Sequence, residues 1–289
     1  MNITLGADPE VFVKQGNRII SAHGLVKGTK KEPEPCFKGA VQIDGVALEY
    51  NIHPAKNKSE FSAYNRVVLE QIQQIIRAKN MGLSIAIQPT AHFEQSYFDK
   101  EIPDENKILG CDPDYNAYTG ECNTPPSTNK PMRTGAGHIH IGWDNPSAIN
   151  SQEHFMDCIA VTKQLDHSLG FLSHLWDRDV ERQELYGKLG SFRPKSFGVE
   201  YRPLSNRWLA YPNLWPWIYE TANKAVNDLL DGKPYWKNPE LPFKDIGFPD
   251  SFPDFNGNKV AYNKIRKNMN VLLGLNYHHK LTSTALEIL

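Results

Sequence analysis

Several features that would place a protein in a familiar class are scarce or missing from this sequence. Its four cysteines contain no C-x-x-C pair, which excludes a zinc ribbon or a thioredoxin-type motif. No apolar run approaches the ~20 residues needed to span a bilayer, and the N-terminus lacks the basic and apolar regions of a signal peptide. The formal net charge of −1 gives no overall basic field for nucleic acid or an anionic membrane. We therefore expect a cytoplasmic protein with reduced thiols, although Cys111 and Cys122 bracket a loop and could pair in an oxidising compartment.

The common nucleotide and hydrolase signatures are also absent. The sequence has no GxxxxGK[ST] loop, no GxGxxG after a strand and no GxSxG elbow, so it lacks the Walker, Rossmann and serine-hydrolase patterns. No repeat of ~20–50 residues occurs, which argues against a solenoid. The strands and helices do not alternate as in a parallel sheet. Their order instead predicts an α+β fold with a mostly antiparallel sheet and helices outside it.

Hydrophobic periodicity and turn residues divide the chain into short strands and longer helices. We expect strands at 2–5, 11–13, 19–23, 39–51 (a hairpin turning at 44–45) and 83–88, and helices at 59–81, 152–175, 213–230 and 258–273. Ser59 is the expected N-cap of the first helix. The 289 residues, 40% of them hydrophobic, suffice for one large domain, and we treat 1–289 as a single one.

One long segment, 99–131, is rich in Pro, Gly, Asn, Asp and Thr, and regular structure is hard to place in it. A loop of this length in a compact protein is usually functional or disordered. Aromatic and polar residues mix within it at 110–118. We therefore expect a loop that covers a substrate.

The most informative stretch is Gly135-Ala-Gly-His138-Ile-His140-Ile-Gly142. Two histidines that alternate with isoleucines place both imidazoles on one face of a strand and the isoleucines on the other. The flanking glycines allow other backbone or a ligand to approach closely. This pattern predicts a strand that presents ring nitrogens to a site; the alternatives for the motif alone are a zinc site lacking two ligands or a solvated strand face.

Three other strand-like segments carry a polar pair with the same spacing of two. They are Asp8 with Glu10, Glu49 with Asn51, and Glu200 with Arg202. Four such pairs suggest one concave sheet face that binds metal and phosphate. Carboxylates combined with histidine suit Mg²⁺ or Mn²⁺, which prefer oxygen ligands.

Positive charge gathers in the segment 178–202, which also contains three glycines. Its basic residues include Arg178, Arg182, Lys188, Arg193, Lys195 and Arg202. Arginine and lysine bind phosphoryl oxygens, arginine with two parallel hydrogen bonds. The segment is therefore a candidate phosphate clamp, with a basic surface loop as the alternative.

The motifs, taken in this order, resemble those of phage-type carboxylate–amine ligases of the glutamine synthetase and glutamate–cysteine ligase superfamily. The matching motifs are Gly6-Ala-Asp-Pro-Glu10, Glu49-Tyr-Asn51, Gly135–Gly142, Arg182-x3-Tyr186-Gly187-x2-Gly190-x2-Arg193 and Gly198-Val-Glu-Tyr-Arg202. The resemblance implies a curved antiparallel half-barrel that holds ATP and divalent cations on its concave face. It also implies that a carboxylate is phosphorylated and that an amine then displaces phosphate to form an amide. If the chain is phage-encoded, its expected location is the host cytoplasm.

The resemblance also assigns roles to individual residues. It implies metal ligation by Asp8, Glu10, Glu49, His138 and Glu200, with Asp8 replacing the longer glutamate that is usual there. It implies phosphate contacts and catalysis by His140, Arg193 and Arg202, and nucleotide contacts by Arg182 and Lys188. For the carboxylate and amine substrates, which are small molecules or peptides, the candidate contacts are Asn51, Arg133, Asp112 and Asn116. The resemblance does not extend to the separate N-terminal domain of glutamine synthetase, so it does not imply that enzyme's ring-shaped oligomer.

Three other interpretations remain open from the sequence. One is a phosphotransferase on the same fold, similar to guanidino kinases, that stops at phosphoryl transfer. Another is a nucleotide- or metal-binding protein without turnover. The third is a metallohydrolase that uses the two histidines, which ATP dependence would distinguish from a ligase.

Overall fold

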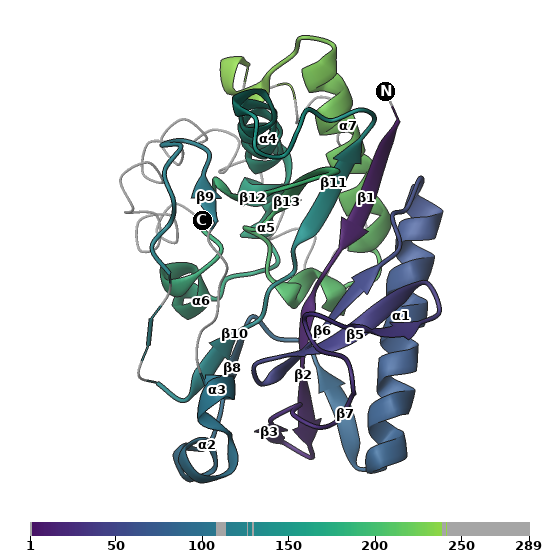
Figure 1. Ribbon diagram of the computed structural model, residues 1–289, viewed down its shortest axis with the longest axis vertical. Coiled ribbons are helices and arrows are strands. Elements are labelled where there is room, and N and C mark those ends of the chain that lie inside the picture. Colours follow the sequence, from purple (N-terminus) through teal and green to yellow (C-terminus); the bar gives the residue numbers. More distant parts are fainter. Residues whose placement is uncertain (1, 108–113, 126, 129, 239–240, 242–289) are drawn as a thin grey trace.

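The computed structural model describes residues 2–107, 114–125, 127–128, 130–238 and 241, and these form antiparallel sheets with helices packed against them (Figure 1). The strands are Ile3–Ala7 (β1), Glu10–Gln15 (β2), Arg18–Ile20 (β3), Glu34–Cys36 (β4), Gly39–Asp44 (β5), Ala47–Ile52 (β6), Leu83–Ala86 (β7), Thr90–His92 (β8), Tyr115–Asn116 (β9), Met132–Thr134 (β10), Ile139–Trp143 (β11), Ser191–Lys195 (β12) and Gly198–Tyr201 (β13). The pairings among these strands do not close a barrel. The predicted α+β class with antiparallel sheets is thus confirmed.

The strands are arranged as two main sheets and one small pair. The first sheet has the order β1-β11-β13-β12-β9, and the second has the order β3-β2-β6-β5-β4 with β7 also paired to β2. The strands β8 and β10 form a separate pair. Figure 1 shows β1 and β2 following one another along the long axis, with β11 beside β1 and with β5 and β6 beside β2. The first ten residues therefore link both sheets.

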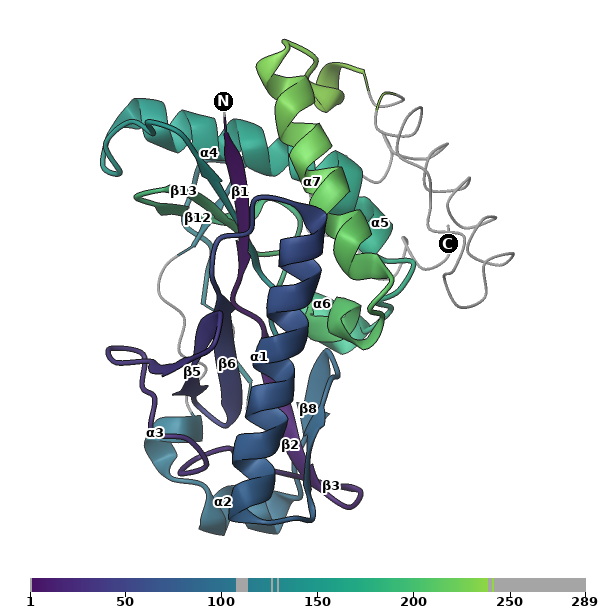
Figure 2. The same cartoon turned by 90° about the vertical axis from the view of Figure 1, so that its right-hand side faces the viewer.

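Helices flank these sheets: the longer ones cover one side, and the short helix that contains Phe98 packs on the other. They are Lys58–Lys79 (α1), Gln95–Glu101 (α2), Asp104–Lys107 (α3), Gln152–Leu165 (α4), Asp166–Gly170 (η1, a π-helical turn), Phe171–Ser173 (α5), Val180–Leu185 (α6), Asn206–Ala210 (η2), Leu214–Leu230 (α7) and Tyr235–Lys237 (η3). The helices α1 and α7 contact each other, α1 packs on β5, β6 and β7, and α4 packs on β12 and β13 (Figure 2). In the described residues, none of these helices has both the length and the apolar character required to cross a bilayer.

Strand alternation decides which side chains face the helices. In β1, Ile3, Leu5 and Ala7 are buried in the main hydrophobic core, as are Ile139 and Ile141 of β11. The residues between them point the other way because successive side chains of a strand alternate. This confirms the expected orientation of the isoleucines and leaves the polar pairs on the opposite face.

A second, smaller core limits that opposite face at the β2 end. Phe12, two residues after Glu10, packs with Phe93 and Phe98 from the β8–α2 region. The face of β2 that carries Glu10 is therefore covered from Phe12 onward. The open part of the face ends at Glu10, close to β1.

The cap of α1 differs from the predicted one. The helix begins at Lys58, and Asn57 rather than Ser59 is the N-cap: its side chain accepts from the Glu60 amide at 2.9 Å. The Glu60 carboxylate reaches back to the Lys56 amide at 2.8 Å. The pattern resembles a capping box, except that Glu60 bonds the amide one residue before the N-cap and not the N-cap amide itself. The two bonds satisfy two amide groups at the helix start.

Other boundaries also required correction. The predicted helix 152–175 is helical to Ser173 but is interrupted by the π-helical turn η1, and the predicted strand 19–23 is the shorter β3. The segment 99–131 is not an unbroken loop, because it includes the end of α2, all of α3 and the short strand β9. The strand β10 begins just beyond it. Cys111, Asp112 and the predicted helix 258–273 lie outside the described residues.

Candidate metal and phosphate site

The candidate site lies where β1 passes into β2, at the junction of the two sheets. The connecting residues run alongside residues 136–138, which precede β11. The Asp8 amide donates to the His138 carbonyl at 3.3 Å, and the Glu10 amide donates to the Ala136 carbonyl at 2.9 Å. These bonds place side chains from both sheets around one point.

The glycine between Ala136 and His138 makes this close approach possible. A Cβ on Gly137 would lie 2.1 Å from the Ser205 carbonyl oxygen, far inside any real contact distance. The Trp208 indole also donates to the Gly137 carbonyl at 3.0 Å. As the sequence predicted, a glycine beside the histidines admits neighbouring backbone.

Cross-strand register brings the first group of polar side chains together. His140 is paired with Gly6 on one side and with Glu200 on the other, and Glu200 is paired with Arg193. Directly opposite residues place their side chains on the same face, within contact distance. The register therefore aligns an imidazole, a carboxylate and a guanidinium across three strands.

The first cluster consists of Asp8, His140 and Glu200, which offer ligand atoms within 4.8 Å of one another. His140 Nε2 lies 3.0 Å from Asp8 Oδ2. His138, which immediately precedes β11, also lies beside this cluster: its Nδ1 is 3.6 Å from Asp8 Oδ1 and 3.4 Å from Glu200 Oε1.

The second cluster consists of Glu10, Asp44 and Glu49, whose oxygen atoms also lie within 4.8 Å of one another. Glu10 is directly opposite Glu49 in the β2–β6 pair, and Gln42 of β5 is opposite Glu49 on its other side. The Gln42 amide donates to Glu49 Oε1 at 3.0 Å. Asp44 follows Gln42 by two residues and so shares its strand face.

The second cluster carries unbalanced negative charge. Burial, Asp44 and Asp8 together raise the pKa of Glu10 to about 7, against a smaller opposing effect of its bond from the Ala136 amide. Burial and the neighbouring carboxylates of Asp8, Glu10 and Asp44 raise the pKa of Glu49 well above its usual range. Closely spaced buried carboxylates hold protons in this way when no cation is near to balance them.

The first cluster has the opposite electrostatic character. Glu200 is fully buried and contacts three cationic side chains: Lys195 Nζ at 2.6 Å, Arg193 Nη1 at 3.2 Å and Arg202. Burial alone would raise the pKa of Glu200, but Arg202 and the other basic groups outweigh it and lower the pKa well below its usual range. Glu200 is therefore ionised and already neutralised by protein groups.

Arg202 connects this cluster to the segment after residue 113. Its Nε donates to Asp114 Oδ2 at 2.9 Å, and its guanidinium also bonds to Glu200 and to the Tyr186 hydroxyl. The Tyr186 hydroxyl lies 3.3 Å from His138 Nε2. Arg202 is thus held by two carboxylates and a phenol, and it is almost fully buried.

The two histidines have different protonation behaviour. Burial and the positive charge of Arg202 lower the pKa of His138 well below its usual range, so its imidazole is neutral. Burial by itself would also lower the pKa of His140, but the adjacent Asp8 carboxylate outweighs it and the pKa is raised. A neutral imidazole is the form that binds metal, and a protonated one is the form that donates to phosphate.

The donor set fits a hard divalent cation. Two groups of three ligand-bearing side chains supply mainly carboxylate oxygens, the ligands that Mg²⁺ and Mn²⁺ prefer. Asp8 Oδ1 and His140 Nε2 are buried without a well-formed hydrogen bond in the described structure. The proton-holding carboxylates of the second cluster are where a cation would be most strongly attracted.

Most of the residues that the sequence singled out meet at this junction. They are Asp8, Glu10, Glu49, His138, His140, Arg193, Glu200 and Arg202. They form two neighbouring groups, with Glu10 and Glu49 in the second and His138 and Glu200 in the first. Asn51 shares the strand face of Glu49, as expected, and Lys188 is exposed.

Two predicted substrate contacts have structural roles instead. Arg133 is buried and donates to the carbonyls of Met132 at 2.7 Å and Asn106 at 3.3 Å, in the small core near α2 and α3. The Asn116 side-chain oxygen accepts from the Tyr118 amide at 2.8 Å and so shapes a turn. Both side chains thus make hydrogen bonds to nearby backbone.

Arg182 is also a structural residue rather than a nucleotide contact. Its side chain is only 1% exposed, and it donates to the carbonyls of Gly135 at 3.2 Å, Pro203 at 3.1 Å and Leu204 at 3.0 Å. It therefore ties the segment before the histidines to the segment after Arg202. A guanidinium bound in this way cannot reach a phosphate.

This assignment predicts a large effect on stability. We expect Arg182→Met to lower the free energy of unfolding by about 3 kcal/mol, because three buried carbonyls lose a charged donor. Urea unfolding measures this change, and Lys188→Ala, an exposed change in the same segment, is the control with an expected effect below ~0.5 kcal/mol. An Arg182→Met protein that is as stable as wild type but loses nucleotide binding would contradict the structural role.

Four residues of the site had been given no individual role: Asp44, Asp114, Tyr186 and Lys195, the last of which was named only within the basic segment 178–202. Two of them carried the same signal as the others, because Asp44 follows Gln42 and Lys195 follows Arg193 with the spacing of two. Asp44 had been interpreted only as part of a turn. Asp114 and Tyr186 reach the site through loops, where no strand periodicity reveals which way a side chain points.

No protein-family model matches the chain, and no curated protein is detectably similar to it in sequence.

Proposed function

We propose that this protein is an ATP-dependent carboxylate–amine ligase that uses Mg²⁺ or Mn²⁺ and forms an amide through an acyl phosphate, on a half-barrel related to that of glutamine synthetase. One observation carries the proposal. Two acidic clusters lie next to each other where the two sheets meet, and three basic side chains adjoin the first of them. Residues that bind cations and residues that bind phosphate thus lie side by side.

The chemistry of phosphoryl transfer needs this combination. Glu10, Asp44 and Glu49 would hold one cation. Asp8 and Glu200, with the neutral imidazole of His138, would hold another. When bound, these ions would offset the negative charge of the phosphates and of the developing transition state. The residues themselves would fix the direction from which ATP approaches the carboxylate substrate.

The basic side chains would have different roles in binding the phosphate. Arg193 and Lys195 have side chains that are 19% and 29% exposed, so both can reach a ligand while they neutralise Glu200. Arg202 is almost fully buried, so it would orient Glu200 and Asp114 and leave the main contact with the phosphate to Arg193 and Lys195. His140, with its raised pKa, would donate a hydrogen bond to a phosphate oxygen.

The segment that begins at Asp114 would cover the substrates. Asp114 is bound to Arg202, and Tyr118 donates to the buried Asp166 at 2.9 Å. These two contacts anchor the segment beside β12. A cover in this position would exclude water, which matters because an acyl phosphate hydrolyses readily.

Trapping the intermediate tests the proposal. The protein is incubated with ATP, Mg²⁺, pooled carboxylates and hydroxylamine, and mass spectrometry follows ADP, phosphate and new hydroxamates. We expect hydroxamates in wild type and their loss in Lys195→Ala, with Lys79→Ala, an exposed lysine of α1, as the control. With a carboxylate labelled with ¹⁸O, one labelled oxygen should appear in the released phosphate, because the acyl C–O bond breaks when the amine attacks.

Other products would identify the alternatives. A phosphorylated amine or guanidine without hydroxamate would mean a phosphotransferase. Hydrolysis of a substrate without ATP would mean a metallohydrolase. Cation binding without any consumption of ATP would mean a binding protein, and each of these results would contradict the ligase.

A further inference from the structure

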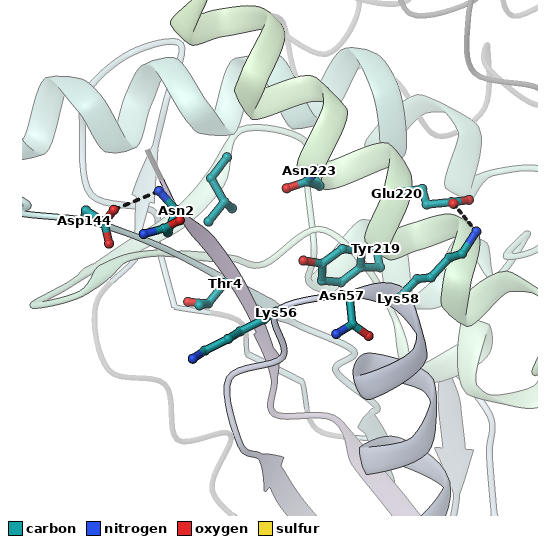
Figure 3. Close-up of a pocket in the computed structure, with 10 residues that line it drawn as sticks. Asn2, Thr4, Lys56, Asn57, Lys58, Asp144, Tyr219, Glu220 and Asn223 are labelled. Carbon is teal, nitrogen blue, oxygen red and sulfur yellow. Dashed lines mark hydrogen bonds and ion pairs between the residues drawn. The ribbon is translucent and has the colours of Figure 1, made fainter.

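A separate cavity of about 690 Å³ lies at the other end of β1, between the start of that strand, the start of α1 and α7 (Figure 3). Its lining includes Asn2, Thr4, Lys56, Asn57 and Tyr219. Thr4 lies in β1 and Asp8 just beyond the end of that strand, four residues away, or roughly 13 Å at ~3.3 Å per residue. The cavity is thus distinct from the two acidic clusters, and its size suits a small-molecule ligand.

The carboxylates around this cavity already have partners. Glu220 forms an ion pair with Lys58, which Figure 3 shows at one side of the cavity. Asp144 accepts from the Asn2 amide at 2.8 Å. Glu60, in the first turn of α1, accepts from the Lys56 amide at 2.8 Å.

Hydrogen-bond donors at the cavity are not used in this way. Within the described part of the chain, the Lys56 ammonium and the Tyr219 hydroxyl have no hydrogen-bond or ion-pair partner. The Asn57 side chain uses its oxygen to cap the helix at 2.9 Å, which leaves its NH₂ group as a donor. The cavity therefore offers an ammonium, an amide and a phenol to a ligand.

Tyr219 is the most informative of these donors. The residue is only 6% exposed, and its ring packs against Phe61 with the centroids 6.1 Å apart. Its hydroxyl points from α7 into the space between Thr4, Asn57 and Asn223 (Figure 3). Burial and the nearby Glu60 raise the pKa of Tyr219, so the hydroxyl stays protonated and can donate.

The start of α1 adds a positive potential to the same space. The helix has 22 residues, and the Asn57 side chain accepts from the Glu60 amide. The amide groups of the two residues before Glu60, Lys58 and Ser59, have no partner within the helix. The amide groups at the start of a helix and its dipole favour an anion. The free donors and the helix therefore select the same kind of ligand.

We propose that this cavity is a second ligand site, which binds a small molecule through a carboxylate or phosphate group contacted by Lys56, Asn57 and Tyr219. The site is independent of the ligase chemistry proposed above. An oxyanion here would accept from the Tyr219 hydroxyl and from the ammonium of Lys56, an exposed residue at the rim of the cavity. Charge-assisted hydrogen bonds of this type are the stronger ones in proteins.

Calorimetric titration of the full chain tests the proposal. Inorganic phosphate and acetate are titrated separately, with sodium chloride of equal ionic strength as the reference and EDTA present to remove divalent ions. We expect Lys56→Ala to weaken binding about tenfold and Tyr219→Phe, which keeps the ring and removes only the hydroxyl, about threefold. Tighter binding of phosphate would indicate a phosphorylated ligand, and tighter binding of acetate a carboxylate.

Two control variants make the result specific. Lys79→Ala removes an exposed lysine at the far end of α1 and should bind as wild type does. Arg193→Ala removes a basic group of the proposed ligase site, and the binding that Lys56→Ala weakens should persist in it. Absence of binding by both anions would overturn the second site. So would binding that Arg193→Ala abolishes and Lys56→Ala leaves unchanged, a result that would place the anion at the ligase site and leave the proposed function intact.

Discussion

Replacing Glu200 with glutamine should cost both activity and about 3–5 kcal/mol of stability. The change removes one negative charge and leaves the shape of the side chain. Glu200 is fully buried and neutralises Arg193, Lys195 and Arg202, so its loss leaves three basic groups without their common partner. An unpaired buried charge is far more costly than the pair is stabilising. Turnover should fall at least 10²-fold, because the basic groups would no longer be held in place.

Urea unfolding and the hydroxamate assay measure these two effects. Glu105→Gln, at an exposed position of α3, is the matched control and should change neither. Adding Arg202→Met to Glu200→Gln should restore part of the lost stability without restoring activity, since the two residues interact directly. A Glu200→Gln protein with wild-type stability would show that the basic side chains do not depend on this carboxylate.

Replacing Glu49 with glutamine should have the opposite effect on stability. In the metal-free protein at pH 8, we expect the free energy of unfolding to rise by roughly 2 kcal/mol, because the change relieves repulsion among buried carboxylates. The same variant should lose the stabilisation that Mn²⁺ gives to wild type, which is about 2.7 kcal/mol when the ion is at 100 times its dissociation constant.

The pKa of Glu10 sets the pH range over which the stability of the metal-free protein changes. It lies at about 7, above the usual 4.5, so the folded protein binds this proton more tightly than the unfolded chain does. The resulting stability is complete below pH ~4.5 and is lost as the pH rises through ~7. Metal-free wild type should therefore become less stable between pH 5 and pH 8, and Mn²⁺ should stabilise it more at pH 8 than at pH 5.

Thermal or urea unfolding at both pH values, with EDTA and with Mn²⁺, measures the difference. Glu70→Gln, an exposed change on α1, is the control and should follow wild type. Equal stabilisation by Mn²⁺ in wild type and Glu49→Gln would show that the second cluster does not bind the ion. Greater stability of metal-free wild type at pH 8 than at pH 5 would contradict the cause given for the raised pKa.

The sequence by itself determined which side chains share a face. Alternation is a local property of any strand, so Ile139, His140 and Ile141 could be assigned to their faces without knowledge of the partner strands. The same rule correctly oriented Glu49 and Glu200. Applied to Gln42, it would also have found Asp44, and applied to Arg193 it would have placed Lys195 on the same face.

Tertiary structure alone decided how these residues are grouped and what holds them. Which strands pair, and in what register, depends on contacts between distant segments, and the register places Glu10 opposite Glu49 and His140 opposite Glu200. Long side chains add a second uncertainty. Arg182 and Arg202 appear equivalent in the sequence, yet one binds backbone carbonyls and the other binds carboxylates, because a guanidinium reaches several residues from its own backbone and its partners are set by the packed fold.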